Sequence, residues 1–315
     1  MFSFIIPLYN RPEEIDELLF SLTKQNYPKP FEIVIVEDGS DNNAKEIVES
    51  YRDRLNIQYF LTHNRGAGMA RNYGMSQAKG DYFIVLDSDV LVPANYLKKV
   101  KKALQANYTD AFGGPDAAHP SFTSLQKAIN FSMTSMMTTG GIRGKKKGVG
   151  KFQPRSFNLG ISKKAFESTG GFSSMKIGED IDLSFRLWEH GFETQLIEKA
   201  FVYHKRRTSI EAFYKQTFKF GSARPVLNKK YPGSAKLTYW FPSVFITGFI
   251  VSSILFMLGS WELITLYYLY FMLLFMSSLI VNKNITVAFL SIITTLVQMT
   301  GYGFGFLKSM FFKNC

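Results

Sequence analysis

Two carboxylates separated by one residue, Asp87 and Asp89, follow the apolar run 82–86. If the extended backbone continues, both carboxylates face one side, because strand side chains alternate with a period of two. Two hard oxygen ligands on one side suit Mg²⁺ or Mn²⁺ bridged to a diphosphate. A turn is the alternative interpretation, since Asp and Ser also favour loop starts.

Short apolar runs followed by helical patterns recur before residue 110 and indicate the elements that would position these carboxylates. The pairs are 2–7 with 13–25, 31–37 with 43–51, 58–61 with 67–78, and 82–87 with 95–107. This alternation predicts an α/β fold with mainly parallel strands buried on both faces. Ligands of such sheets bind outside the carboxyl ends of the strands. The first, second and fourth runs end there in polar residues, which we expect to form one site: Asn10-Arg11, 37–40 and 87–89.

The charge of the chain is strongly basic and unevenly distributed. Its 315 residues include 37 Lys and Arg against 25 Asp and Glu, a net charge of +12, which favours an anionic partner. From Thr238 onward the charged residues are Glu262, Lys283, Lys308 and Lys313, so nearly all the positive charge precedes the apolar tail. Because the cations concentrate beside that tail, we do not expect nucleic acid as a partner. The single cysteine, Cys315, excludes an intramolecular disulfide and a cysteine-based zinc site.

Three almost uncharged runs in the tail, 239–258, 263–281 and 285–307, have about the 20 residues that a helix needs to cross a bilayer. Their uniform apolarity predicts membrane helices rather than a buried core. The tight connectors 259–262 and 282–284 predict that the first two runs form an antiparallel pair. Lys308 and Lys313 at the end of the third run would lie on the wrong side if all three crossed. The third run therefore spans despite a small charge bias, or it is re-entrant or interfacial.

The segments around the tail complete the expected organisation. The run 2–6 is too short for a signal sequence and lacks a basic leader, so we expect the residues before 238 in the cytoplasm. The segment 205–237 interleaves cations with aromatic residues and suits anionic membrane lipids, with a solvated linker as the alternative. The segment 140–150 holds five glycines and four cations, and we expect a mobile loop that is either a surface excursion or a clamp on phosphates.

Ordered motifs over about residues 1–210 resemble glycosyltransferase family 2. They are FIIPLYN at 4–10, VIVEDGS at 34–40, NRG at 64–66, ARN at 70–72, GDY at 80–82, DSD at 87–89, NLGI at 158–161, GGF at 170–172, and GEDIDL at 178–183 with Arg186. The apolar tail is similar to that of membrane-attached bacterial members that build exopolysaccharide repeat units, such as succinoglycan-type transferases. The resemblance implies a GT-A fold, which is a Rossmann-like nucleotide-sugar-binding domain, and inversion at the anomeric carbon by direct displacement.

The resemblance also implies roles for individual residues. In donor binding, the nucleotide pocket would be lined by Pro7, Tyr9 and Asn10, the base would be bound by Asp38, and base or phosphate by Arg71. Asp87 would bind the ribose or metal region, Asp89 would be the main metal ligand, and His204 would meet the metal or the diphosphate. Arg206 and Arg207 suit a diphosphate by their bidentate geometry, and headgroup attraction is the equal alternative.

Glu179 and Asp180 precede the helix-like run 181–189, and the resemblance implies acceptor contact for Glu179 and general-base catalysis for Asp180. An acidic residue at a helix start is also a good cap, which lowers its pKa, whereas a base benefits from a raised one. Repulsion between the two neighbouring carboxylates would raise the pKa of one of them. We favour catalysis, mainly because of the resemblance.

A Met-rich helix face forms a separate prediction, and its residues are Leu125, Ile129, Met133, Met136 and Met137. We expect it to pack against the sheet, with a polyprenyl chain as the alternative partner. Processive family members carry Gln-x-x-Arg-Trp near the membrane, but here Gln216 is followed by TFKF, which argues against a chain-extending synthase.

The combined expectation is a GT-A domain over 1–222, a basic juxtamembrane segment over 205–237, and two or three membrane helices within 238–315. The enzyme would use Mg²⁺ or Mn²⁺ to move a sugar from a nucleotide-sugar to a lipid-linked saccharide, with polyprenyl diphosphate as the expected carrier. It would act on the cytoplasmic side of a bacterial inner membrane. The alternatives are a catalytically silent nucleotide-binding membrane subunit and a glycolipid or short-run processive synthase.

Overall fold

The computed structural model describes residues 1–140 and 151–312 and divides the chain into two compact units. The first unit comprises residues 1–119 and 143–205, and the second comprises 120–142 and 206–315. The chain passes into the second unit at residue 120 and again at residue 206, and residue 222, near which we expected a boundary, lies inside the helix Ile210–Lys230. Apart from Gly140, the predicted loop 140–150 lies outside the described residues.

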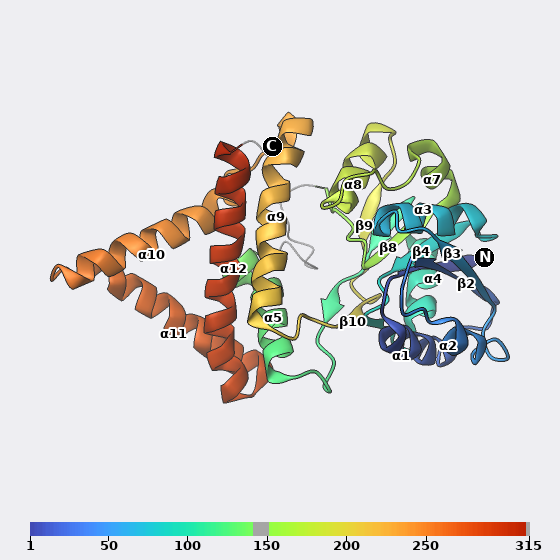
Figure 1. The fold of residues 1–315 in the computed structure, drawn as a ribbon, viewed down its shortest axis with the longest axis horizontal. Helices are drawn as coiled ribbons and strands as arrows, with labels where there is room; N and C mark the ends of the chain where they lie inside the picture. Colours follow the sequence, from blue (N-terminus) through green and yellow to red (C-terminus); the bar gives the residue numbers. More distant parts are fainter. Residues whose placement is uncertain (141–150, 313–315) are drawn as a thin grey trace. The chain divides into compact units, whose positions relative to one another are not determined.

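A seven-stranded mixed sheet forms the centre of the first unit, in the order β3-β2-β1-β4-β8-β6-β9 (Figure 1). The strands are β1 (Phe2–Leu8), β2 (Phe31–Asp38), β3 (Ile57–Thr62), β4 (Tyr82–Leu86), β6 (Ala111–Gly113), β8 (Asn158–Ser162) and β9 (Thr194–Leu196). β3, β2, β1 and β4 are mutually parallel, while β8 runs antiparallel to both β4 and β6. The predicted α/β class is confirmed, and the carboxyl ends of β1, β2 and β4 lie at one edge.

Helices cover both faces of this sheet. They are α1 (Pro12–Thr23), α2 (Lys45–Glu49), α3 (Ala67–Gln77), α4 (Tyr96–Ala106), α7 (Lys163–Thr169) and α8 (Glu179–Glu189). Phe4 belongs to a core cluster with Leu18 of α1 and Leu97 of α4, whereas its neighbour Ile5 belongs to a second cluster with helices α3 and α8. Successive residues of a strand therefore enter opposite apolar layers, as expected for buried parallel strands.

A small second sheet in the same unit joins β5 (Val90–Leu91), β10 (Val202–His204) and β7 (Asp116–Ala117), with β10 in the middle. β10 is antiparallel to β5, and His204 pairs with Val90. The sheet thus carries the end of β10 to the loop that follows β4.

The second unit is helical. Its elements are α5 (Ser124–Thr134), α6 (Met136–Thr139), α9 (Ile210–Lys230), the 3-10 turns η1 (Pro232–Ser234) and η2 (Leu237–Trp240), α10 (Phe241–Met257), α11 (Glu262–Asn282) and α12 (Ile285–Phe311). Among the described residues, three helical stretches are long and apolar enough to cross a membrane: 237–257, 262–282 and 285–311. They coincide with the three predicted apolar runs. The predicted juxtamembrane segment 205–237 is largely the helix α9.

α9 and α12 lie side by side, and glycines allow their close approach (Figure 1). A Cβ added to Gly221 of α9 would lie 2.1 Å from the carbonyl oxygen of Tyr302, and one added to Gly305 of α12 would lie 2.1 Å from that of Phe218. Because backbone atoms cannot yield at such distances, the two helices form one tightly packed pair.

The expectation that the Met-rich face of 124–139 packs against the sheet is wrong. Ile129 and Met133 of α5 form a cluster with Phe213 of α9, and Val297 of α12 packs against it. The Ser132 hydroxyl lies 2.7 Å from the Thr294 hydroxyl, so α5 is also hydrogen-bonded to α12. The helical spacing correctly indicated an apolar face, but the partner of that face is other helices.

Candidate active site

The predicted donor-binding residues at the ends of β1 and β2 are brought together by hydrogen bonds. The N–H of Asn10 donates to the Ser40 hydroxyl at 2.7 Å, and the N–H of Asn42 donates to the Asn10 side-chain oxygen at 3.0 Å. Asn10 adopts a positive φ of 51°, which turns the chain sharply after β1. Pro7 lies in β1, and Tyr9 beyond its end is 47% exposed, so its ring is free to meet a flat ligand.

Asp38 at the end of β2 is buried and serves as an acceptor for the following loop. Its carboxylate accepts the N–H groups of Arg65 at 3.0 Å and Gly66 at 2.8 Å. Gly66 has a φ of 88° and precedes α3, so Asp38 fixes the entry into that helix. A contact of Asp38 with a nucleobase stays a prediction.

The three predicted metal ligands converge. Asp87, Asp89 and His204 each offer one ligand atom, and these atoms lie within 4.8 Å of one another. Nε2 of His204 lies 3.2 Å from Oδ1 of Asp89, and the N–H of Lys205 donates to the Asp89 carbonyl at 3.0 Å. The pairing of β10 with β5 produces this proximity. Two carboxylates and one imidazole fit Mn²⁺ or Mg²⁺, which prefer oxygen ligands and leave positions for phosphate oxygens.

Three further residues surround this cluster, and two of them, Asp116 and Phe157, were not predicted from the sequence. Nη1 of Arg11 lies 2.9 Å from Oδ2 of Asp89, and Oδ2 of Asp116 lies 4.0 Å from Nδ1 of His204. The ring of Phe157 stacks on the His204 ring at 4.8 Å. The Asp116 carboxylate thus places a negative charge beside the imidazole of His204. Arg11, next to Asn10, was visible as a polar strand end, but nothing in the sequence indicated that β7 carries Asp116 to β10.

Arg71 joins the metal cluster to the acidic pair of α8. Its Nη2 lies 2.7 Å from Oδ1 of Asp87, and its Nη1 lies 3.1 Å from Oε1 of Glu179. The side chain is only 5% exposed, and its Nε makes no hydrogen bond within the described residues. Arg71 thus bridges two carboxylates across the site, and its contact with base or phosphate stays a prediction.

Glu179 and Asp180 open α8, after Gly178 at a φ of 82°. Oδ1 of Asp180 accepts the N–H of Ile181 at 2.8 Å, and its Oδ2 lies 3.8 Å from Nη1 of Arg155. Burial raises the pKa of Glu179, the charge of Asp180 raises it further, and Arg71 opposes both effects. Repulsion between the pair therefore acts on the pKa of Glu179.

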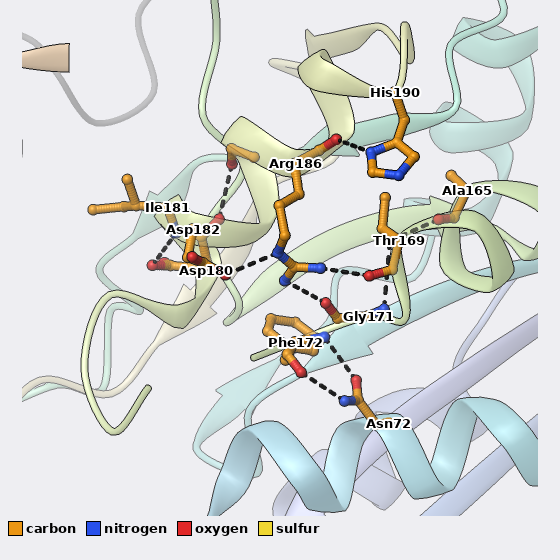
Figure 2. A network of polar contacts seen from close by, with 11 residues as sticks. Asn72, Ala165, Thr169, Gly171, Phe172, Asp180, Ile181, Asp182, Arg186 and His190 are labelled. Carbon is orange, nitrogen blue, oxygen red and sulfur yellow. Dashed lines mark hydrogen bonds and ion pairs between the residues drawn. The ribbon is translucent and has the colours of Figure 1, made fainter. Parts of the chain in front are cut away.

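A polar network fixes the position of α8 (Figure 2). Nε of Arg186 lies 3.0 Å from Oδ2 of the buried Asp182, and its Nη1 and Nη2 donate to the carbonyls of Thr169 at 2.6 Å and Gly171 at 2.5 Å. Asn72 of α3 accepts the N–H of Phe172 at 2.8 Å and donates to its carbonyl at 2.7 Å. The motif at 170–172 and the motif at 178–183 with Arg186 are thus one construction that holds the acidic pair in place.

Arg186→Ala should destabilise the first unit by about 3 kcal/mol, because it removes the guanidinium that lies 3.0 Å from the buried Asp182 carboxylate. It should also lower turnover by releasing the start of α8. Thermal unfolding together with kcat measures both effects, and Lys164→Ala at an exposed position of the neighbouring α7 is the control. An Arg186→Ala protein with the melting temperature of the Lys164→Ala control would contradict the role given to this network.

The raised pKa of Glu179 predicts a pH-dependent stability difference. Since folding raises this pKa above its ordinary value of 4.5, the folded state binds the proton more tightly. The resulting stabilisation is present below that value and is lost as the pH rises through the folded pKa. Relative to Glu179→Gln, which cannot titrate, the unsubstituted protein should lose free energy of unfolding as the pH rises from 4.5 through the folded-state pKa of Glu179. Denaturant titrations of both proteins from pH 4 upward check this, and a constant difference would contradict it.

Arg206 and Arg207 belong to the second unit, and the structure gives Arg206 a partner there. Its Nη2 donates to the side-chain oxygen of Asn130 at 3.0 Å, and its carbonyl accepts from the Gln126 amide at 3.0 Å. Arg206 is buried and anchors the start of the 206–209 segment to α5. The roles of both arginines in donor binding stay predictions.

Comparisons with known proteins agree with this fold. Residues 3–170, more than half of the chain, match the model of glycosyl transferase family 2. The poly(ribitol-phosphate) beta-N-acetylglucosaminyltransferase TarS of Staphylococcus aureus is 38% identical over 112 residues, which are 35% of this chain and 20% of TarS. The match thus spans a fifth of that longer protein. The glycosyltransferase AglE of Haloferax volcanii is 27% identical over 227 residues, or 70% of this chain and 72% of AglE.

A solved structure is similar over nearly the whole chain. The mannosyltransferase PcManGT of Pyrobaculum calidifontis, solved in complex with GDP-Man and Mn²⁺, has a TM-score of 0.67 at 14% identity. The alignment covers 99% of this chain and 88% of that one. At this identity the likeness concerns the fold, and it confirms the predicted GT-A domain followed by apolar helices.

Proposed function

Because the chain belongs to glycosyl transferase family 2, we propose that it is a metal-dependent, inverting enzyme that acts at a membrane. It is a glycosyltransferase with a nucleotide-sugar donor. The observation that carries the proposal is the convergence of Asp87, Asp89 and His204 beside the polar ends of β1 and β2. Donor-binding and metal-binding side chains are then adjacent, as transfer from a nucleoside diphosphate requires.

The proposed reaction is one displacement. The acceptor oxygen bonds to the anomeric carbon while the bond from that carbon to the diphosphate oxygen breaks, and the acceptor proton passes to Asp180. Asp87, Asp89 and His204 would hold a divalent ion, which would supply positive charge to neutralise the departing nucleoside diphosphate. Arg71 holds Asp87 and Glu179 in place between the two sides, and the Arg186 network orients the helix that carries the base.

The proposed acceptor is a saccharide linked to a membrane lipid, with polyprenyl diphosphate as carrier. Three apolar helices support membrane attachment, which a transferase between two soluble substrates does not need. TarS is named for transfer to poly(ribitol-phosphate), which supports a role in surface polysaccharide synthesis. On this proposal the enzyme works at the cytoplasmic side of a bacterial inner membrane, in contact with anionic lipids.

The test is transfer from a panel of labelled nucleotide-sugars to polyprenyl-diphosphate saccharides in detergent, with Mn²⁺ and with a chelator. We expect a labelled lipid-linked product with inverted anomeric configuration in the Mn²⁺ reaction and none with the chelator. Equal transfer in the presence of the chelator would overturn the metal dependence. Transfer to diacylglycerol in place of the polyprenyl acceptor would favour the glycolipid alternative.

A further inference from the structure

The apolar helices of the second unit form a triangle (Figure 1). α10 meets the C-terminal part of α12, where the Ser243 hydroxyl donates to the Gly303 carbonyl at 3.2 Å and the rings of Trp240 and Phe306 lie 4.9 Å apart. α11 meets the N-terminal part of α12, where the hydroxyls of Ser278 and Ser291 lie 2.7 Å apart. These attachment points are about 18 Å apart along α12.

α10 and α11 converge away from α12. The rings of Phe249 and Tyr267 lie 5.2 Å apart, and at the tip the rings of Phe256 and Trp261 lie 4.5 Å apart. Helices that leave a third helix at separate points and then meet cannot both be parallel to it. If the α10–α11 hairpin runs along the bilayer normal, the axis of α12 therefore lies at a large angle to that normal.

The bilayer normal runs either along the α10–α11 hairpin or along α12, and the packing of α9 on α12 distinguishes the two. α9 carries exposed Glu211, Lys215 and Lys219 on one face, and the glycine contacts hold it along α12. If α12 crossed the bilayer, these charges would be carried into the hydrocarbon, where a charged side chain is strongly disfavoured. α10 and α11 hold no charged residue after Glu262, and their lengths of about 26 and 32 Å match a hydrocarbon core of about 30 Å.

The exposed side of α12 suits the edge of the acyl layer. Its exposed large side chains recur along one stripe, which consists of Ile285, Phe289, Ile293, Phe304 and Phe311. Gly301 and Gly305 face α9 on another side of the helix. An apolar stripe backed by charged elements is typical of a helix that lies in the interface plane.

The flanking residues agree with two crossings. Tyr239 and Trp240 stand at the foot of α10, and Trp261 stands at the tip of the hairpin, as aromatic residues do at the two interfaces. The basic residues near the helices, Lys229, Lys230, Lys236, Lys283 and Lys308, all lie on the side of α12, whereas the connector 258–261 has none. Two crossings place every one of these cations on one side.

We propose that the chain crosses the membrane twice, through α10 and α11, and that α12 lies in the plane of the cytoplasmic interface with its exposed stripe against the acyl chains and α9 on the water side. This inference rests on the proposed membrane attachment. It goes beyond that proposal because it assigns the third apolar helix to the membrane surface. It also places the C-terminus on the same side of the membrane as the first unit, which carries the candidate active site and is called the catalytic unit below.

The chain carries its own reporter, because Cys315 is its single cysteine. In sealed membrane vesicles of both orientations, a membrane-impermeant maleimide should label Cys315 from the same face as Ser50→Cys, an exposed position of the catalytic unit. Ser260→Cys at the hairpin tip should label from the opposite face. Both cysteine substitutions are made with Cys315→Ser. Labelling of Cys315 from the face of Ser260→Cys, or of Ser260→Cys from the face of Ser50→Cys, would overturn the proposal.

A depth measurement separates an in-plane α12 from a re-entrant one. Spin labels at Phe289→Cys, Ile293→Cys and Phe304→Cys, each with Cys315→Ser, should report the same shallow depth in lipid vesicles. A depth maximum at Ile293→Cys would show a dipping helix and overturn the proposal. Sugar transfer by the detergent-solubilised enzyme is independent of topology, so a failure here is distinguishable from a failure of the proposed function. If α10–α12 do not attach the protein to membranes, the full chain should appear in the soluble fraction after cell fractionation. That result would overturn both the proposed topology and the proposed membrane attachment.

Discussion

Asp180→Asn is expected to lower kcat by about 10²–10⁴-fold, the contribution typical of a positioned general base. The amide keeps the size of the side chain and its acceptor for the Ile181 N–H, which lies at 2.8 Å, but it cannot take a proton from the acceptor hydroxyl. Donor affinity should be unchanged, because Asp180 is assigned to the acceptor side. The measurement is kcat with saturating donor, together with calorimetric titration of the nucleoside diphosphate.

Two variants on the same helix serve as controls for this result. Glu189→Gln, at the exposed end of α8, should leave kcat unchanged. Glu179→Gln should affect turnover less than Asp180→Asn does, since Glu179 is paired with Arg71 at 3.1 Å and is assigned acceptor contact only. A larger loss in Glu179→Gln than in Asp180→Asn would reverse the two assignments and make the residue with the raised pKa the base.

Asp89→Asn should abolish most metal affinity, with a loss greater than the roughly 10–100-fold that removal of an outer-shell partner causes. Asp89 lies at the centre of the cluster, 3.2 Å from Nε2 of His204 and 2.9 Å from Nη1 of Arg11. An amide in its place leaves less negative charge to hold a divalent ion. Mn²⁺ titration followed by electron paramagnetic resonance measures the affinity without relying on turnover.

The matched control for Asp89→Asn is Asp41→Asn, an exposed carboxylate in the loop after β2. It should bind Mn²⁺ as the unsubstituted protein does, and it should keep the rise in melting temperature that Mn²⁺ causes by binding the folded state. Unchanged Mn²⁺ affinity in Asp89→Asn would remove the central ligand of the proposed site.

The sequence predicted most elements of the first unit before residue 110, because each of these is encoded locally. Apolar runs and helical periods located β1, β2, β3 and β4 with their helices, and strand ends located Asn10, Asp38 and Asp87. The position of His204 depends on the pairing of β10 with β5, a contact between distant segments that periodicity does not encode. The resemblance supplied His204, whereas Asp116, carried by the same small sheet, was missed.

The second unit shows the same limit from the other direction. The spacing of Ile129 and Met133 indicated that α5 has an apolar face, and this was correct, but apolar periodicity reports burial and not the partner. The chain placed that face against Phe213 and α12. Residue 222, near which we expected a boundary, lies within α9, and Gly221 beside it packs on α12.

The passage of the chain through the second unit at 120–142 has a consequence for biosynthesis. During translation α5 leaves the ribosome before its partners α9 and α12 are synthesised. Ile129, Met133 and the hydroxyl of Ser132 therefore stay exposed until the last helix emerges. In a chain that ends at residue 205, this apolar face of α5 would stay exposed, because α9 and α12 would be missing. An autonomous catalytic unit would therefore require excision of the 120–142 excursion as well as removal of the tail.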